Sequence, residues 1–163
     1  MKYQKIDSKL FIKNRENFLS RMKPNSIAFF NSNDIYPVSA DSTLPFEQHR
    51  DIFYLSGVDQ EESVLMLCPS CSDQNLREVL FLKETDDHIA VWEGPKLNKE
   101  QAFETSGIKS IFWLDKMENI IDKVMNECET IYFNHNEHYR AKLKWKPEKK
   151  GLTNGLKANI QIS

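Results

Sequence analysis

Two cysteines, Cys68 and Cys71, are the clearest candidates for chemistry, because C-x-x-C is the minimum spacing of a zinc knuckle or a redox dithiol. A zinc site needs two further ligands, and the sequence has neither a second C-x-x-C nor a histidine pair beside this one. A thioredoxin-like motif opens a helix, whereas this pair closes an apolar run and enters the turn-forming residues 72–75. We therefore interpret the pair as a strand end followed by a loop.

Two histidines, His135 and His138, form a second candidate. Their i, i+3 spacing could present both imidazoles to a divalent metal on one helical turn. A catalytic zinc site requires a third protein ligand, and this pair falls where a strand passes into a helix, so a capping role is favoured. The sequence also lacks glycine-rich phosphate loops, the G-x-S-x-G nucleophile elbow and the H-E-x-x-H motif. We accordingly assign no catalytic residue and no metal ligand.

The basic stretch Arg140–Lys150 could contact nucleic acid, with Trp145 stacking on a base. The chain as a whole carries 22 Lys and Arg against 24 Asp and Glu, which gives a net charge of −2. This balance favours a solvated helix end followed by a linker, and we expect no nucleic-acid partner. The chemistry-bearing residues therefore do not make a self-sufficient active site.

The composition describes the fold that must position these residues. A length of 163 residues with 40% hydrophobic and 28% charged residues is typical of one globular domain. No apolar run approaches the roughly 20 residues that span a bilayer, and residues 1–18 have no signal-peptide core. Three cysteines form no even-numbered disulfide framework, which favours a reducing compartment. These features predict a cytoplasmic protein without a membrane partner.

Helices and strands are predicted from hydrophobic spacing and from capping residues. Four segments are predicted as helices: Ser8–Met22, Lys99–Thr105, 115–125 and Glu137–Trp145. The predicted N-caps of the first three are Ser8, Asn98 and Asp115, and Gly107 is predicted to end the second helix. Six short runs are predicted as strands: Ser26–Asn31, Ser63–Cys68, Glu78–Lys83, His88–Trp92, Ile111–Leu114 and Thr130–Asn134. Strands and helices alternate after the first third of the chain, which indicates an α/β fold. The segment Asn31–Asp51 is predicted as a long ordered loop, and such loops usually have a function.

The most specific part of the sequence lies between Pro45 and Gly57. It begins with a proline and an aromatic residue, and it continues with glutamine, aspartate, tyrosine, serine and glycine at intervals. Acidic residues then follow shortly before an aliphatic run. This segment resembles the signature of the N-terminal domain of aminopeptidase P, in the creatinase/prolidase family. The matching residues are Pro45, Phe46, Gln48, Asp51, Tyr54, Ser56 and Gly57.

A second segment supports the resemblance. The residues from Trp92 through Gly94 to Leu97 look like the family's Trp-x-Gly-x-Arg/Lys-Leu motif, and the likeness covers roughly residues 8–145. Glu47 and Arg50 depart from the pattern, since the family often has Arg at the first position and Ser at the second. Arg50 lies close enough in sequence to replace the missing cation at position 47.

The resemblance implies a fold and a domain arrangement. We expect a three-layer α/β/α domain with a mixed sheet of five or six strands, similar to ribonuclease H-like domains. The strands at Ser26–Asn31, Ser63–Cys68 and Glu78–Lys83 should form its centre. Residues 1–150 would make this domain, and 151–163 would begin a linker to a C-terminal pita-bread catalytic domain that is absent from this sequence.

The resemblance also implies a function for the parent protein, a dinuclear-metal Xaa-Pro aminopeptidase that removes an N-terminal residue preceding proline. The family binds two manganese or similar divalent ions through two Asp, one His and two Glu in the C-terminal domain. This chain would then be inactive alone, shaping substrate access and subunit contacts in a homodimer or homotetramer. Its partners would be its own catalytic domain and proline-containing peptides.

The family motif also suggests one residue close to substrate, Trp92, which could instead pack locally as a hairpin aromatic. We expect Trp92 to be at least partly accessible. Two alternatives for the whole protein remain open at this stage. The parent could be a prolidase or a creatinase-like enzyme, or the chain could be a free-standing protein-binding module of the same fold.

Overall fold

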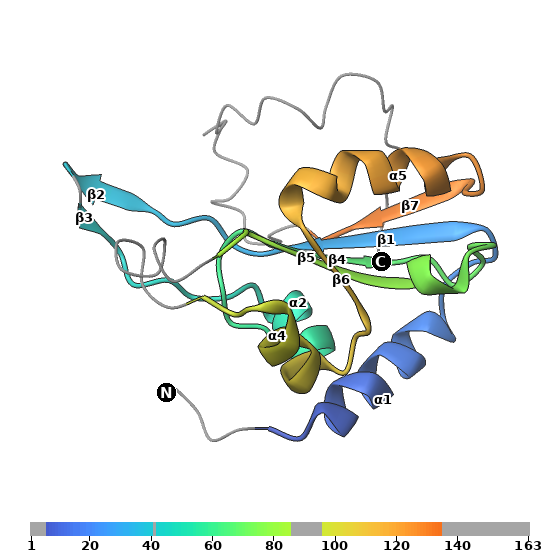
Figure 1. Cartoon of the computed structure of the whole chain (residues 1–163), viewed down its shortest axis with the longest axis horizontal. Helices are drawn as coiled ribbons and strands as arrows, with labels where there is room; N and C mark the ends of the chain where they lie inside the picture. The colour runs from blue at the N-terminus through green and yellow to red at the C-terminus, as the bar shows by residue number, and fades with distance from the viewer. Residues whose placement is uncertain (1–5, 41, 86–95, 135–163) are drawn as a thin grey trace.

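The computed structural model describes residues 6–40, 42–85 and 96–134 of the chain. Its centre is a five-stranded sheet in the order β6-β5-β4-β1-β7 (Figure 1). These strands are β1 (Ser26–Asn31), β4 (Ser63–Leu67), β5 (Glu78–Leu82), β6 (Ser110–Trp113) and β7 (Thr130–Phe133). The three strands predicted to be central are adjacent in the sheet, which confirms that prediction.

The sheet is mixed, as expected. β4 pairs antiparallel with β1 and β5, whereas the outer strands β7 and β6 run parallel to their neighbours β1 and β5. All five residues of β4 are buried, and so are four of the five in β5. Such continuous apolar runs form strands that are covered on both faces of a sheet.

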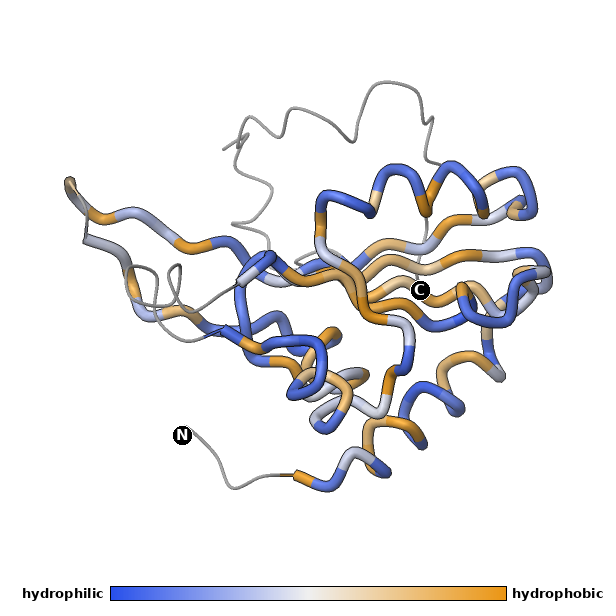
Figure 2. Tube along the Cα trace, viewed as in Figure 1, coloured by the Kyte–Doolittle hydropathy of each residue, from blue (hydrophilic) through white to orange (hydrophobic). Residues whose placement is uncertain are grey.

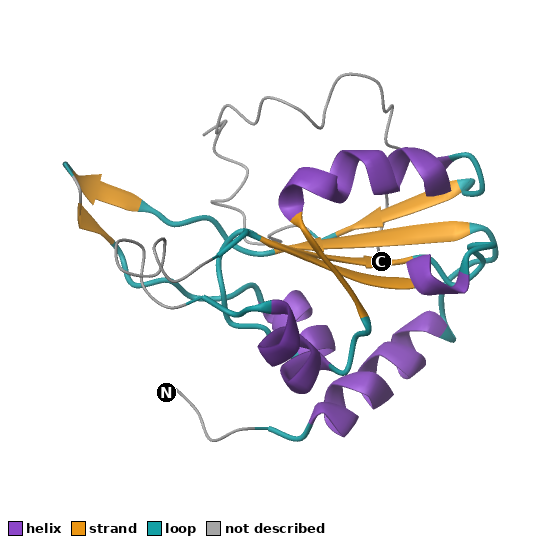
Figure 3. Cartoon of the chain, viewed as in Figure 1, coloured by secondary structure: helices purple, strands orange, loops and turns teal. Residues whose placement is uncertain are grey.

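Helices cover both faces of the sheet and produce the three layers that the sequence predicts (Figure 3). The helices α1 (Ser8–Leu19), α2 (Arg50–Ser56) and α4 (Lys99–Ser106) lie on one face, and α5 (Met117–Met125) lies on the other. Alternate residues of β1 divide between the two resulting cores, with Ala28 and Phe30 facing the three helices and Ile27 and Phe29 facing α5.

The helix ends test the predicted caps. At α4, Asn98 and Gln101 form a reciprocal capping box, and Gly107 ends the helix in the left-handed conformation at φ 73°, both as expected. At α1 the N-cap is Asp7, whose carboxylate accepts from the Lys9 backbone N–H, so the prediction of Ser8 was wrong by one residue. The acidic side chain of Asp7 is an equally good acceptor one position earlier.

The entry to α5 also differs from the prediction. Asp115 does not cap this helix, because it lies inside a short 3-10 turn, η2 (Leu114–Lys116), that leads directly into it. The Asp115 carboxylate instead lies 2.7 Å from the ammonium group of Lys116.

The segment predicted as a long loop contains a small hairpin. Its strands β2 (Pro37–Ser39) and β3 (Ser42–Thr43) pair antiparallel with each other and not with the main sheet. We call residues 34–40 and 42–44 the arm, because these segments project away from the sheet beyond the end of β1 (Figure 1). The hydropathy trace shows apolar residues in the strands of the core and again along the arm (Figure 2).

Candidate functional site

Gln48, a residue of the signature segment, connects two loops through its side-chain amide. Its Nε2 donates to the backbone carbonyls of Val58 at 3.1 Å and Gln60 at 2.8 Å. Its Oε1 accepts from the backbone N–H of His49 at 2.8 Å. One side chain therefore satisfies backbone groups on both loops, so Gln48 fixes the path of the chain into α2.

The start of α2 places two signature residues at the surface. His49 is the N-cap, and its Nδ1 accepts from the backbone N–H of Asp51 at 3.3 Å. The Asp51 carboxylate lies 3.6 Å from the same imidazole nitrogen and is about half exposed. Tyr54, one turn later, is also exposed.

Gly57 ends α2 and cannot be replaced without strain. Its φ of 72° lies in the left-handed region, and its N–H donates to the Phe53 carbonyl at 2.8 Å. A Cβ added here would overlap the ring of Phe11 in α1. The glycine of the signature is therefore required both by backbone conformation and by close packing of α1 against α2.

A buried arginine joins the three helices to the sheet. Arg15 in α1 is 1% exposed, and its Nη1 donates to the carbonyls of Leu55 at 2.8 Å and Ser106 at 3.0 Å. Its Nε donates to the Glu78 carboxylate at 2.8 Å. These carbonyls lie in the last turns of α2 and α4, where the helix dipoles favour a cation. Apolar spacing along the sequence carries no signal for such a residue.

The two sequence motifs meet through Gln60. Its backbone carbonyl accepts from Gln48 of the first motif, and its side-chain Oε1 accepts from the backbone N–H of Leu97 in the second at 2.7 Å. The neighbouring Glu61 carboxylate pairs with Lys96, also of the second motif. The structure thus brings residues 48 and 96–97 onto the same turn before β4.

Electrostatics strengthen this junction. Burial alone would raise the pKa of Glu61, but the hydrogen bond from Lys96 and the positive charges of Lys96 and Lys83 outweigh it, so its pKa lies below the ordinary value. The Lys96 side chain is only 5% exposed. A cation as buried as Lys96 needs a carboxylate partner, and Glu61 therefore remains ionised beside it.

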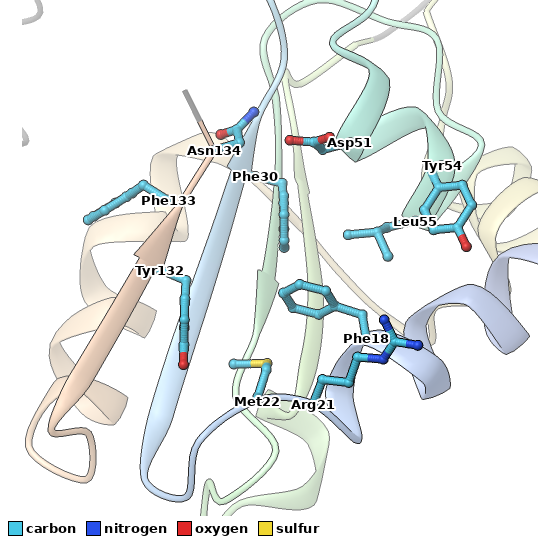
Figure 4. Close-up of a pocket in the computed structure, with 10 residues that line it drawn as sticks. All are labelled: Phe18, Arg21, Met22, Phe30, Asp51, Tyr54, Leu55, Tyr132, Phe133 and Asn134. Atoms are coloured by element: carbon cyan, nitrogen blue, oxygen red, sulfur yellow. The ribbon is translucent and has the colours of Figure 1, made fainter. Parts of the chain in front are cut away.

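A cavity of about 360 Å³ lies beside the signature helix, and we call it the α1–β7 groove. Side chains from the end of α1, from α2, from β1 and from the edge strand β7 surround it (Figure 4). Its lining combines apolar walls with a few polar groups, as ligand-binding clefts do. The lining residues are Phe18, Arg21, Met22, Phe30, Asp51, Tyr54, Leu55, Tyr132, Phe133 and Asn134.

The last described residue, Asn134, lies at one end of this groove and next to the arm. Its Nδ2 donates to the Asn31 carbonyl at 2.9 Å, and its Oδ1 accepts from the Asn31 N–H at 2.9 Å. The side chain extends the pairing of β1 and β7 by one more step. The chain therefore leaves β7 beside the point where the arm begins.

The base of the arm is fixed by polar contacts while its apolar side chains face solvent. Asn33 donates across the base to the Glu47 carbonyl at 2.9 Å, and the backbone N–H of Ser32 donates to the Ser63 carbonyl at 2.9 Å. Beyond this base, four of the eight large hydrophobic residues that are exposed in the described ranges lie close together on the arm. These are Ile35 (41% exposed), Tyr36 (61%), Val38 (58%) and Leu44 (52%).

The structure sorts the predicted site residues into three groups. Asp51 and Tyr54 reach the groove, whereas Gln48 and Gly57 serve the backbone. Pro45 is exposed and Phe46 half-buried, just beyond the arm. Trp92 and Gly94 lie outside the described residues, so the expected accessibility of Trp92 stays a prediction. His135, His138 and the basic stretch also lie outside them.

The described ranges contain neither a cluster of metal ligands nor a membrane-spanning helix. Over residues 6–40, 42–85 and 96–134, no group of three His, Cys, Asp or Glu side chains is arranged to hold a metal ion. Within the same ranges, none of the helices has the length and apolarity needed to cross a bilayer.

Comparison with known proteins agrees with this geometry. The family model described as "Aminopeptidase P, N-terminal domain" matches residues 11–132. The Xaa-Pro aminopeptidase of Escherichia coli K12 is 25% identical over 155 residues, which cover 95% of this chain and 35% of that protein. Xaa-Pro aminopeptidase 3 of Rattus norvegicus is 26% identical over 69% of this chain and 22% of its own length. The chain thus spans about a third or less of these relatives.

Solved structures show the same similarity. The low-pH form of aminopeptidase P from E. coli superposes with a TM-score of 0.71 at 26% identity, over 86% of this chain and 32% of that one. Pseudomonas aeruginosa aminopeptidase PepP gives a TM-score of 0.73 at 23% identity, over 82% of this chain and 30% of that one. The second likeness is a likeness of fold.

Proposed function

Because the chain belongs to the aminopeptidase P N-terminal domain family, we propose that it serves as the non-catalytic N-terminal domain of a Xaa-Pro aminopeptidase. In this role it shapes access to the catalytic site and takes part in subunit contacts. The observation that supports the role is the fixed base of the arm below its exposed apolar side chains. Exposed apolar patches of this kind are typical of protein interfaces.

The position of the arm fits a contact with a domain that follows in sequence. Asn134 holds Asn31 at the root of the arm, so whatever continues from β7 starts beside it. The family model is of an N-terminal domain, and about two thirds of the E. coli relative lies outside the matched part. A following domain would therefore contact the arm before it contacts other parts of this domain.

The chemistry itself is proposed to reside in that following domain. Two manganese-type ions, held there by the family's Asp, His and Glu ligands, would polarise the scissile carbonyl and supply hydroxide near neutral pH. The residues of this chain would instead form walls around the substrate. Trp92 is the proposed substrate-proximal residue, and proline-containing peptides are the proposed substrates.

A chimera tests this role. The matching part of the E. coli enzyme is replaced by this chain, and hydrolysis of an Arg-Pro-Pro peptide and of an Xaa-Pro dipeptide is measured with Mn²⁺. We expect no turnover by the chain alone, and turnover of the tripeptide by the chimera. A Trp92→Ala chimera should lose kcat/KM without a lower Tm in the isolated chain.

Three outcomes would contradict the proposal or redirect it. Hydrolysis by the chain alone would contradict a non-catalytic role. A chimera that cleaves only dipeptides would favour a prolidase parent. A stop codon directly after codon 163 in the gene would favour a free-standing binding module, whereas an open frame containing the Asp, His and Glu ligand set would support the peptidase.

A further inference from the structure

Two thiols meet at the end of the sheet opposite the arm. The Sγ atoms of Cys68 and Cys128 lie 3.5 Å apart, although 60 positions separate them in sequence. Cys68 directly follows β4, and Cys128 lies in the turn between α5 and β7. Cys68 is fully buried, whereas Cys128 is only partly buried and can be reached from solvent.

Polar contacts hold the two backbone segments in place around the thiols. The Glu127 carboxylate accepts from the backbone N–H of Ser72 at 2.7 Å and from its hydroxyl at 2.8 Å. In addition, the Asn25 N–H donates to the Ser70 hydroxyl at 3.3 Å, and the Asn25 carbonyl accepts from the Glu129 N–H at 2.7 Å. The turn after β4 and the turn before β7 are therefore bound to each other independently of the cysteines.

We propose that Cys68 and Cys128 are a disulfide-forming pair, oxidised by a hydroperoxide. The Cys128 thiolate attacks the peroxide oxygen, so that an S–O bond forms, the O–O bond breaks, and an alcohol or water leaves with the proton. The Cys68 sulfur then attacks the Cys128 sulfenic acid, which forms the S–S bond and releases the hydroxyl group as water with the Cys68 proton. Two thiols and one hydroperoxide thus give one disulfide, one alcohol and one water.

The order of the two steps follows from exposure. Cys128 reacts first because the peroxide can reach it, and buried Cys68 then acts as the resolving thiol at contact distance. Burial raises the pKa of both thiols, and the hydrogen bond between them opposes this rise at Cys128. The negative charge of the neighbouring Glu127 carboxylate also disfavours the Cys128 thiolate, so the oxidation should be slow at neutral pH and faster at alkaline pH.

Cys71 is the natural competitor, since it is the other half of the C-x-x-C pair. It is 1% exposed, and its backbone N–H donates to the Cys68 carbonyl at 3.1 Å in a tight turn. A 68–71 disulfide would close only this turn, whereas a 68–128 disulfide would join the end of β4 to the α5–β7 connection. A cross-link that closes a long loop stabilises the fold more than one that closes a short loop.

The test is peptide mapping of the intact chain after incubation with hydrogen peroxide, without reductant. Trypsin places both Cys68 and Cys71 on the peptide 51–77 and Cys128 on the peptide 124–140, so a 68–128 bond joins two peptides and a 68–71 bond does not. We expect joined peptides, loss of two free thiols and a Tm higher by about 5–10 °C that dithiothreitol reverses. A Cys71→Ala variant should behave in the same way.

A Cys128→Ala variant should form no joined peptides and show no rise in Tm. It replaces a partly buried thiol and leaves β4 intact, so it should still fold. A 68–71 bond in the wild-type chain would overturn the proposal. It would also be overturned by oxidation of Cys128 to a sulfinic acid while Cys68 remains a free thiol, or by retention of all three thiols at pH 8.5.

Discussion

The central sheet and the arm contain similar apolar residues but bury them to very different extents. Leu65 in β4 and Leu80 in β5 are completely buried between two layers of helices. Val38 and Leu44 on the arm are both more than half exposed, although a fixed base holds the segment that carries them. The sheet therefore buries its apolar surface within the domain, whereas the arm leaves its apolar surface exposed and available to a partner.

This difference separates what the domain needs in order to fold from what it offers to a partner. Removing a side chain from the sheet creates a cavity, while removing one from the arm changes only solvated surface. Substitutions in the two regions should therefore affect different measurements, namely the free energy of unfolding for the sheet and enzyme activity for the arm.

The largest expected effect is at the centre of the sheet. Phe81→Ala removes a fully buried ring that lies 6.4 Å from the Phe112 ring, and it should lower the free energy of unfolding by about 3–5 kcal/mol. The matched change on the arm, Val38→Ala, should alter it by less than about 0.5 kcal/mol. Urea unfolding followed by circular dichroism measures both values. Equal losses would break the distinction between the two regions.

The next largest effect concerns the polar contacts that join the helices to the sheet. Arg15→Ala leaves the Glu78 carboxylate and two helix-end carbonyls without their donor and should cost about 3 kcal/mol. Arg21→Ala, at the exposed rim of the groove, is the control and should cost about 0.5 kcal/mol or less. If the two variants are equally stable in urea, the buried arginine does not hold the layers together.

A smaller effect that depends on pH is expected where the two motifs meet. The pKa of Glu61 is lowered in the folded chain, so its contribution is present above the unfolded-state pKa and is lost as the pH falls through the lowered value. Glu61→Gln should therefore cost about 1 kcal/mol at pH 7, and this cost should shrink as the pH falls towards 3.

The control for this variant is Glu62→Gln, which removes a half-exposed partner of Lys83 and should change stability by about 0.5 kcal/mol or less at either pH. Chemical denaturation over a pH series measures both variants. A loss at Glu61 that is the same at pH 3 and pH 7 would show that packing, and not charge, explains it.

The smallest effect on stability is expected on the arm itself. Val38→Asp places a carboxylate in solvent and should change the free energy of unfolding by about 0.5 kcal/mol or less. The same change in the chimera should lower kcat/KM, because a charge would then be buried against the following domain. Asn17→Asp, at an exposed position of α1 away from the arm, is a control for added charge. Full activity in the Val38→Asp chimera would argue against the arm as an interface.

Much of the sheet and both ends of α4 could be predicted from sequence, because local features encode them. The apolar runs of β1, β4 and β5 are short and continuous, which is typical of strands covered on both faces. Asn98 and Gly107 mark the ends of α4 by capping chemistry that involves only neighbouring residues. Asp51 and Tyr54 of the signature line the groove, although the sequence predicted no cavity there.

Other features were not predictable because they depend on contacts between distant residues. The role of Arg15 appears only when α2 and α4 end beside it, and Cys68 meets Cys128 only after β4 and β7 are placed in one sheet. The strands of the arm were missed for a different reason. With three and two exposed residues, they are too short to show an alternating pattern.

The contacts of Arg15 also have a consequence for the speed of folding and unfolding. They join residues that are 40, 63 and 91 positions apart, so each requires the closure of a long loop before it forms. Such contacts are expected to form after the transition state, when the sheet and its helices are already in place. Their loss should then accelerate unfolding and leave the folding rate almost unchanged. In this domain the contacts of Arg15 would form late in folding, and they would determine how long the native state persists once it has been reached.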